Sequence, residues 1–166
     1  MKRVIFLFAG FIFSNTLFSQ VSLKVLEKIV TANPVKVKKM LTDFNKESIE
    51  PGGNITWKKE TAEVFEVVSR TSSSYDTLVN YQFSNATHFN TLFEAIKKSA
   101  GNKILLDKSD GSIRQIFLEN KIYSYSLMVM GPKEKPYKYI VNIRRYKPHE
   151  PYDNDIRNEV KEKDSN

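Results

Sequence analysis

Few side chains in this sequence could do chemistry, because it contains two histidines and no cysteine. His88 lies where a helix is predicted to begin, and His149 lies between two prolines near the C-terminus. A zinc site needs three or four ligands, drawn mainly from Cys, His and carboxylates, and the two histidines do not have the spacing of one. We therefore expect both histidines to lie on the surface, and we expect no metal ion or other cofactor.

The motifs of serine hydrolases and of phosphate-binding loops are also missing. Asp107–Gly111 resembles the start of a calcium loop, but position 12 of that loop would be Leu118 where a glutamate is needed. A turn explains these residues better. Glu60, Glu63 and Glu66 could supply paired carboxylates, yet Glu66 alternates with apolar residues on a predicted strand, which places it on the solvent face.

The feature with most chemical content is a basic, tyrosine-rich stretch near the end of the chain. Basic side chains beside aromatic rings can hold an anionic glycan or lipopolysaccharide by charge attraction and stacking. The same residues could instead be solvated strand positions, since lysines on an edge strand discourage aggregation. The candidate binding residues are Tyr137, Lys138, Tyr139, Arg144, Arg145 and Tyr146.

Two functions from different classes fit these residues. In the first, the protein is a non-catalytic module that binds a partner protein or an anionic envelope component through its sheet. In the second, it is a small secreted hydrolase acting on a polyanionic substrate, with His149, Glu119 and Arg144 gathered only by folding. We favour the first, because no catalytic motif is present.

The N-terminus predicts where the protein acts. Lys2 and Arg3 precede an apolar run of about ten residues, and polar residues follow it. This order is typical of a secretory signal, and the run is too short for a membrane span, which needs roughly 20 apolar residues. We expect cleavage near Ser19/Gln20 and a periplasmic or secreted protein that has no stable membrane span and does not meet intracellular nucleic acid.

Composition and patterning predict one α+β domain over residues 20–147, after the signal peptide of residues 1–19. The chain has 166 residues, a net charge of +7 and 27% charged residues, which suits an ordinary globular domain. Residues 148–166 contain six acids and three bases with almost no large apolar side chains, so we expect a disordered tail.

Amphipathic spacing predicts helices over 34–45 and 87–100, and less clearly over 21–30. Asn33 before Pro34 reads as a helix N-cap. About five antiparallel strands are expected, the last three of them a meander, with two or three helices mainly on one face of the sheet.

The two better helices share a face pattern at an offset of 52 residues, and strands follow each. This hints at a duplicated unit of one helix and a hairpin. The order of elements does not distinguish a flat two-layer sandwich from a curved, cone-like sheet.

Overall fold

A computed structural model describes residues 20–61, 64–101, 103–131 and 138–146. Over these residues the chain forms two helices and four strands, followed by one helix and four strands. The elements are α1 (Leu23–Thr31), α2 (Pro34–Met40), β1 (Lys46–Ile49), β2 (Ile55–Glu60), β3 (Phe65–Ser72), β4 (Asp76–Phe83), α3 (Ala86–Ser99), β5 (Ile104–Asp110), β6 (Ile113–Glu119), β7 (Ser124–Val129) and β8 (Tyr139–Tyr146).

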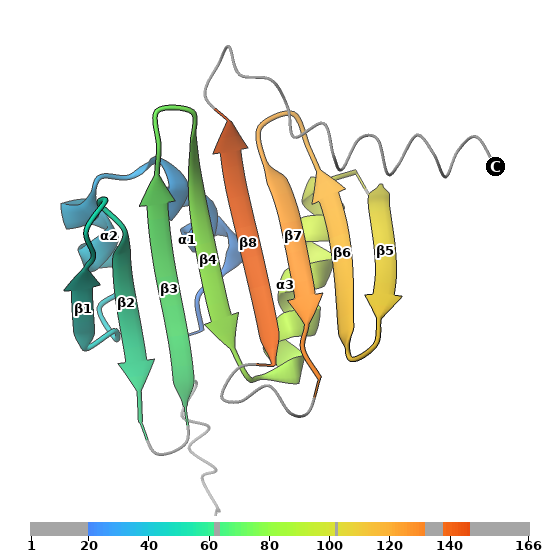
Figure 1. Cartoon of the computed structure of the whole chain (residues 1–166), viewed down its shortest axis with the longest axis horizontal. Coiled ribbons are helices and arrows are strands. Elements are labelled where there is room, and N and C mark those ends of the chain that lie inside the picture. The colour runs from blue at the N-terminus through green and yellow to red at the C-terminus, as the bar shows by residue number, and fades with distance from the viewer. Residues whose placement is uncertain (1–19, 62–63, 102, 132–137, 147–166) are drawn as a thin grey trace, which may run out of the picture.

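The eight strands of the described residues form one antiparallel sheet, in the order β1-β2-β3-β4-β8-β7-β6-β5 (Figure 1). Each half of the chain is a four-stranded meander, and the two meanders join through their last strands, β4 and β8. In that central pair Asn80 lies opposite Asn142. The sheet therefore continues from one half to the other without a break.

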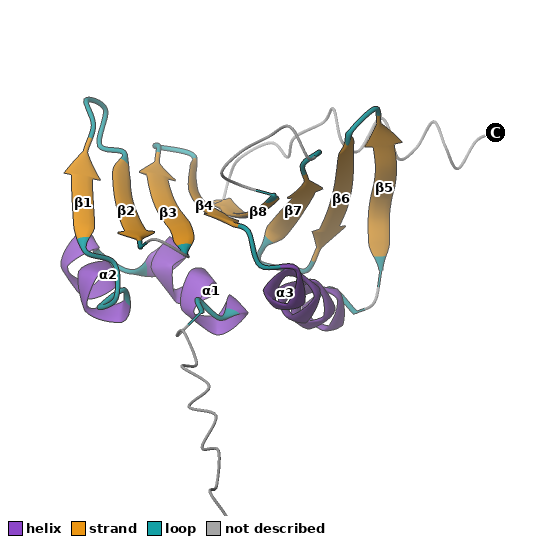
Figure 2. Ribbon diagram, turned by 90° about the horizontal axis from the view of Figure 1, so that it is seen from below, coloured by secondary structure: helices purple, strands orange, loops and turns teal. Residues whose placement is uncertain are grey.

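The three helices all lie against the same face of the sheet (Figure 2). α1 contacts β4 and β8 at the centre of the sheet and also contacts α3. Figure 2 shows that the sheet is bent, with the outer strands reaching further from the helices than β4 and β8. The helix layer is therefore closest to the sheet at the central pair of strands.

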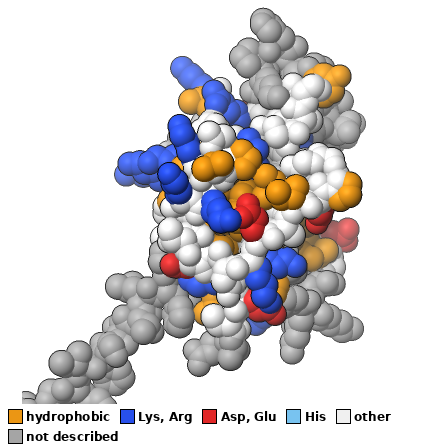
Figure 3. All heavy atoms as spheres, turned by 90° about the vertical axis from the view of Figure 1, so that its left-hand side faces the viewer, with side chains coloured by type: hydrophobic (Ala, Val, Ile, Leu, Met, Phe, Trp, Pro, Cys, Tyr) orange, Lys and Arg blue, Asp and Glu red, His pale blue; other side chains and the backbone are white. Residues whose placement is uncertain are grey.

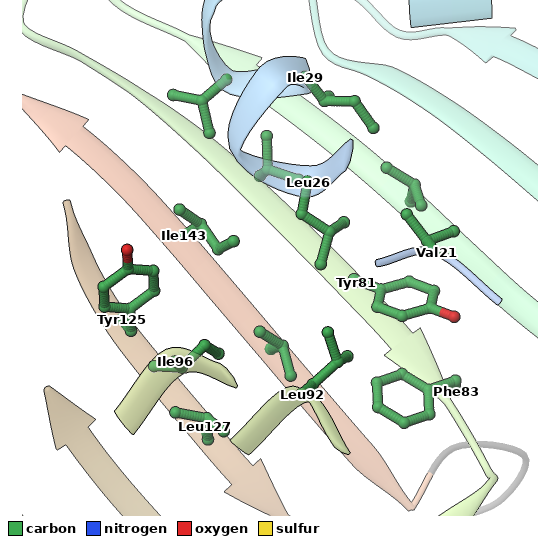
Figure 4. Close-up of a cluster of buried hydrophobic side chains, with 14 of the residues drawn as sticks. Val21, Leu26, Ile29, Tyr81, Phe83, Leu92, Ile96, Tyr125, Leu127 and Ile143 are labelled. Atoms are coloured by element: carbon green, nitrogen blue, oxygen red, sulfur yellow. The ribbon is translucent and has the colours of Figure 1, made fainter. Parts of the chain in front are cut away.

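The hydrophobic core lies between this helix layer and the sheet (Figure 4). α1 supplies Leu26 and Ile29, α3 supplies Ile96, and β8 supplies Ile143, and none of these side chains is exposed. Side chains along a strand alternate between the two faces, so β2, β3, β4, β6, β7 and β8 contribute residues from one face to this core. Burying several such side chains stabilises the fold by about 1.5–3 kcal/mol for each of them.

Short polar side chains begin each helix, as their types predict. Asn33 Oδ1 accepts from the Lys36 amide at 2.9 Å, immediately before Pro34, so the predicted N-cap of α2 is confirmed. Asn85 Oδ1 accepts from the His88 amide at 2.8 Å at the start of α3. Each cap satisfies a backbone N–H group that has no partner within its helix.

The prediction of an α+β fold is confirmed at this coarse level, but the predicted strand count is wrong. The described residues form eight strands, not about five. β1 is one of the strands that the sequence does not mark, and it is held by pairing with β2. Its residues Lys46–Ile49 are all exposed, so no apolar alternation marks this strand in the sequence.

The packing of the helices also differs from the prediction. Residues 21–30 were expected to form only an uncertain extra helix, but α1 occupies the centre of the sheet. The proposed duplication treats the helices of 34–45 and 87–100 as equivalent elements. In the structure, however, the helix that contacts α3 is α1. Each half of the chain carries four strands, so the proposed repeat of one helix and a hairpin is too short.

Two parts of the predicted domain plan fall outside the described residues: the signal peptide of residues 1–19 and the tail of 148–166. Among the helices that are described, none has the length and apolar character needed to cross a membrane.

The cap of α3 can be tested by replacing Asn85 with alanine. Loss of the side-chain acceptor leaves the His88 amide unpaired, so we expect Asn85→Ala to lower the free energy of unfolding by about 1 kcal/mol. Urea denaturation would measure it. Asn90→Ala is the matched control, because Asn90 is exposed within the same helix and alanine has the higher helix propensity. An equal loss in both variants would contradict the cap.

Candidate functional site

The face of the sheet turned away from the helices is the first candidate site, and we call it the open face. It consists of the alternate side chains of all eight strands that do not enter the core. In the central strands these include Asn80 and Gln82 of β4, Ile140 and Asn142 of β8, and Ser126 of β7. No helix of the described residues lies against it (Figures 1 and 2).

A row of short polar side chains crosses this face. The register of the strands places one such residue on each of six neighbouring strands, β1, β2, β3, β4, β8 and β7, so that each residue lies opposite the next. The row consists of Ser48, Thr56, Ser69, Asn80, Asn142 and Ser126. We call it the polar row.

Hydrogen bonds between neighbours hold the polar row in place. The Thr56 and Ser69 hydroxyl oxygens lie 3.1 Å apart. Gln82 Nε2 donates to Asn80 Oδ1 at 2.7 Å, and Asn80 Nδ2 donates to Asn142 Oδ1 at 2.7 Å. Because Gln82 donates to Asn80 and Asn80 donates to Asn142, the Nδ2 group of Asn142 is the last donor in this series of hydrogen bonds. The row is thus an ordered set of donors and acceptors.

Apolar side chains lie beside the polar row. Val67 of β3, Ile140 of β8 and Met128 of β7 belong to the next row across the sheet, with Gln82 among them. Val67 is only 4% exposed although it lies outside the main core. The centre of the open face is therefore a mixture of uncharged polar and apolar groups.

Charged residues of the open face balance one another within the described strands. The strand register puts four basic and four acidic side chains on this face, and the pair nearest the centre, Arg144 and Asp76, is in contact at 3.3 Å. The eight are Lys46, Lys58, Lys108, Arg144, Glu60, Asp76, Asp110 and Glu119.

The structure separates the candidate binding residues of the last strand. Arg144 lies on the open face, whereas Tyr139 and Arg145 lie on the helix side, where the Tyr139 ring stacks on Phe89 with ring centroids 4.6 Å apart. Lys138 is exposed just before β8. Tyr146 ends β8, and Tyr137 is outside the described residues. These six residues therefore do not form one surface.

The residues of the alternative hydrolase are not brought together either. Glu119 of β6 and Arg144 of β8 both lie on the open face, but β7 runs between them and places Ser124 opposite each. His149 is outside the described residues. Within those residues, no group of three or more histidines, aspartates and glutamates could hold a metal ion.

A second candidate site lies on the helix side of the sheet, where the predictions for Glu66 and His88 are wrong. Both were expected on the surface, but Glu66 is 4% exposed and His88 is 6% exposed. Glu66 lies on the same face of β3 as Val68, beneath the helix layer. His88 lies in the first turn of α3, with its ring 4.8 Å from that of Phe83.

One tyrosine and one backbone segment connect these two buried groups. The Tyr81 hydroxyl donates to Glu66 Oε2 at 2.7 Å. The Val21 N–H donates to the same hydroxyl, and the His88 ring donates to the Val21 carbonyl. Burial raises the pKa of the Glu66 carboxyl and that of the Tyr81 phenol, and it lowers the pKa of His88 to about 4. His88 is therefore a neutral imidazole at neutral pH.

A cavity of about 220 Å³ opens beside this cluster. Its walls include Gln20, Glu66, Phe83, Asn85 and His88. His88 Nε2 is buried with no hydrogen-bond partner among the described residues. Because the other ring nitrogen donates to Val21, Nε2 carries the lone pair. The cavity thus has the Glu66 carboxyl group, an acceptor, in its wall, and it suits a ligand that donates hydrogen bonds.

The buried pair predicts a specific dependence of stability on pH. The pKa of His88 lies below its usual value of 6.5, so between pH 6.5 and pH 4 the unfolded chain binds a proton that the folded chain does not. We expect the unfolding free energy to fall through this range as the solution is acidified, with His88 contributing a loss of about 3 kcal/mol by pH 4. Urea denaturation at several pH values would measure it.

Two variants should change that slope in opposite directions. His88→Gln keeps a donor for the Val21 carbonyl but does not titrate, so the loss at acid pH should shrink. Glu66 has a raised pKa and opposes this loss, since its folded form gains a proton first as the pH falls. Glu66→Gln should therefore steepen the loss. Parallel slopes in all three proteins would contradict the assignment.

Comparison with models of known protein families, with curated proteins and with solved structures found no match to this chain. A function for it must therefore be argued from the geometry and chemistry of these two sites.

Proposed function

We propose that the protein is an exported, non-catalytic module that binds a partner protein with its open face. The observation that carries this proposal is the eight-stranded sheet with all described helices on its other face. A sheet face of this size that carries an ordered polar row beside Val67, Ile140 and Met128 offers both hydrogen bonds and apolar contacts. Both kinds of contact are found at the centre of protein–protein interfaces.

The charges of the open face favour a protein partner over a polyanion. The described residues place four basic and four acidic groups there, so this face carries no excess of positive charge to attract an anionic glycan. The strand register puts Phe65, Phe117 and, at the end of β8, Tyr146 at positions of this face. The centre is uncharged, as the cores of protein interfaces tend to be.

Export is part of this proposal. We propose that the signal peptide of residues 1–19 is removed near Ser19/Gln20 and that the domain acts in the periplasm or outside the cell. Val21 lies in the core at 6% exposure. Cleavage before Gln20 would keep this residue and all the helices and strands of the described residues.

The partner surface can be tested by photo-crosslinking in the exporting cell. A photoreactive amino acid at Ser126 lies in the polar row, and one at Asn90 lies on the helix side as the matched control. We expect an adduct of defined mass with one protein from position 126 and none from position 90. Adding Ile140→Arg to the Ser126 probe should lower the adduct yield about tenfold, because a charge would enter the apolar part of the interface.

The outcome is interpretable only for folded protein, so each variant should keep the urea midpoint of the parent. Equal adducts from positions 126 and 90 would argue against the open face as the binding surface. The absence of a specific adduct from any open-face position would do the same.

An anionic envelope component is the second candidate, because the helix layer is basic. The three helices carry seven lysines (Lys24, Lys28, Lys36, Lys38, Lys39, Lys97 and Lys98) and two acids, Glu27 and Glu94. Figure 3 shows basic side chains gathered at the edge formed by α2 and β1. Binding of lipopolysaccharide or heparin through this layer would weaken with added salt, since exposed charges are screened.

A further inference from the structure

Both backbone polar groups of Val21, near the first of the described residues, have partners in the domain. Val21 is 6% exposed, its N–H donates to the Tyr81 hydroxyl, and its carbonyl accepts from His88. Figure 4 shows Val21 beside the Tyr81 ring. Because Gln20 is joined directly to Val21, these contacts also keep Gln20 near the Tyr81 hydroxyl and His88.

Gln20 shares the cavity of about 220 Å³ with Glu66 and His88. The Val21 nitrogen is hydrogen-bonded to the Tyr81 hydroxyl, which lies 2.7 Å from Glu66 Oε2. Neighbouring residues are 3.8 Å apart along the chain. Gln20 therefore lies in the wall of the same cavity as Glu66.

Among the described residues, the charged groups around Glu66 are one base and one further acid. Facing Glu66 are Lys59 of β2, Asp43 after α2, Tyr81 of β4 and His88 of α3. Lys59 Nζ lies 3.7 Å from Asp43 Oδ2, so one lysine serves two carboxylates, while the tyrosine and the histidine are neutral. A buried carboxylate is costly unless a charge or hydrogen bonds compensate it, and one more cation would balance the cluster.

We infer that this cavity is a binding site for the protein's own α-ammonium group, which removal of the signal peptide would create on Gln20. Hydrolysis of the Ser19–Gln20 peptide bond consumes one water, leaves a carboxylate on Ser19 and frees the amine of Gln20, which takes up a proton at neutral pH. The ammonium donates to the Glu66 carboxylate. The inference rests on the proposed cleavage site.

The consequence is a fold that becomes more stable when export is complete. In the precursor the nitrogen of Gln20 belongs to a neutral peptide bond, so it brings no charge to the cavity. After cleavage the same nitrogen carries a positive charge beside the buried Glu66. An exported chain crosses the membrane unfolded, and a stabilising ion pair that forms only after cleavage does not hinder that step.

The test compares two purified chains, one beginning at residue 20 and one beginning at Ser19. Both carry Gln20→Ser, because an N-terminal glutamine can cyclise with loss of ammonia and lose its charge. The α-amine pKa is measured by NMR titration, and urea denaturation is followed from pH 7 to pH 10. In the first chain we expect the amine pKa to rise by about one unit above the usual 7.7–8.0.

The sign of the pH effect follows from that shift. An amine with a raised pKa in the folded state stabilises the protein fully below about pH 7.7, and the stabilisation is lost as the pH rises through the folded pKa. The unfolding equilibrium constant of the chain beginning at residue 20 should therefore increase about tenfold more between pH 7 and pH 10 than that of the longer chain.

Glu66→Gln should abolish both effects, and Glu60→Gln is the matched control. Glu60 is an exposed acid on the adjacent strand that pairs with Lys46 at 2.8 Å, so its replacement should leave the amine pKa unchanged. An ordinary amine pKa in the folded chain, or the same shift in the chain beginning at Ser19, overturns the inference.

Terminal sequencing and intact mass of the exported wild-type protein test the cleavage separately. A terminus at Gln20 with a free amine supports the site in the cell. Cleavage elsewhere, an uncleaved chain, or a mass lower by one ammonia would overturn the ammonium site in the exported protein. None of these results bears on the partner proposed for the open face.

Discussion

The pairing of β4 with β8 is the constraint on which the rest of this structure depends. Eight residue pairs join these strands, from Asp76 opposite Tyr146 to Phe83 opposite Tyr139, and they turn two four-stranded meanders into one sheet. Strand alternation then sends Tyr81 and Ile143 into the core and Asn80 and Asn142 to the other side. The same register therefore builds the core under α1 and the polar row of the open face.

The elements that the sequence predicts well are those whose signals are local. α3 has apolar residues at helical spacing between Asn85, which caps it, and Gly101, which takes the left-handed backbone conformation after it with φ of +65°. β1 carries no such signal, because its four residues are exposed and it is held only by pairing with β2. β1 forms because it pairs with β2, and the sequence around residues 46–49 contains no pattern that predicts this pairing.

The buried cluster was missed for a related reason. Val67 and Val68 are both buried although they face opposite sides of the sheet, so the apolar pattern around Glu66 does not tell which side the carboxylate faces. Its partner Tyr81 lies on another strand, and Val21 lies far away in the sequence. The absence of cysteine excludes a metal centre built on that residue. Whether a single acid or histidine is buried depends on tertiary contacts, and the sequence does not show these.

The two candidate sites differ in what the fold needs from them. The polar row lies outside the core, and hydrogen bonds between its members order it. The Glu66 cluster is costly to stability, since a buried acid and an unpartnered imidazole nitrogen both lose hydration. A fold tolerates such a cost where another group compensates it, and Gln20 lines the same cavity as Glu66 and His88.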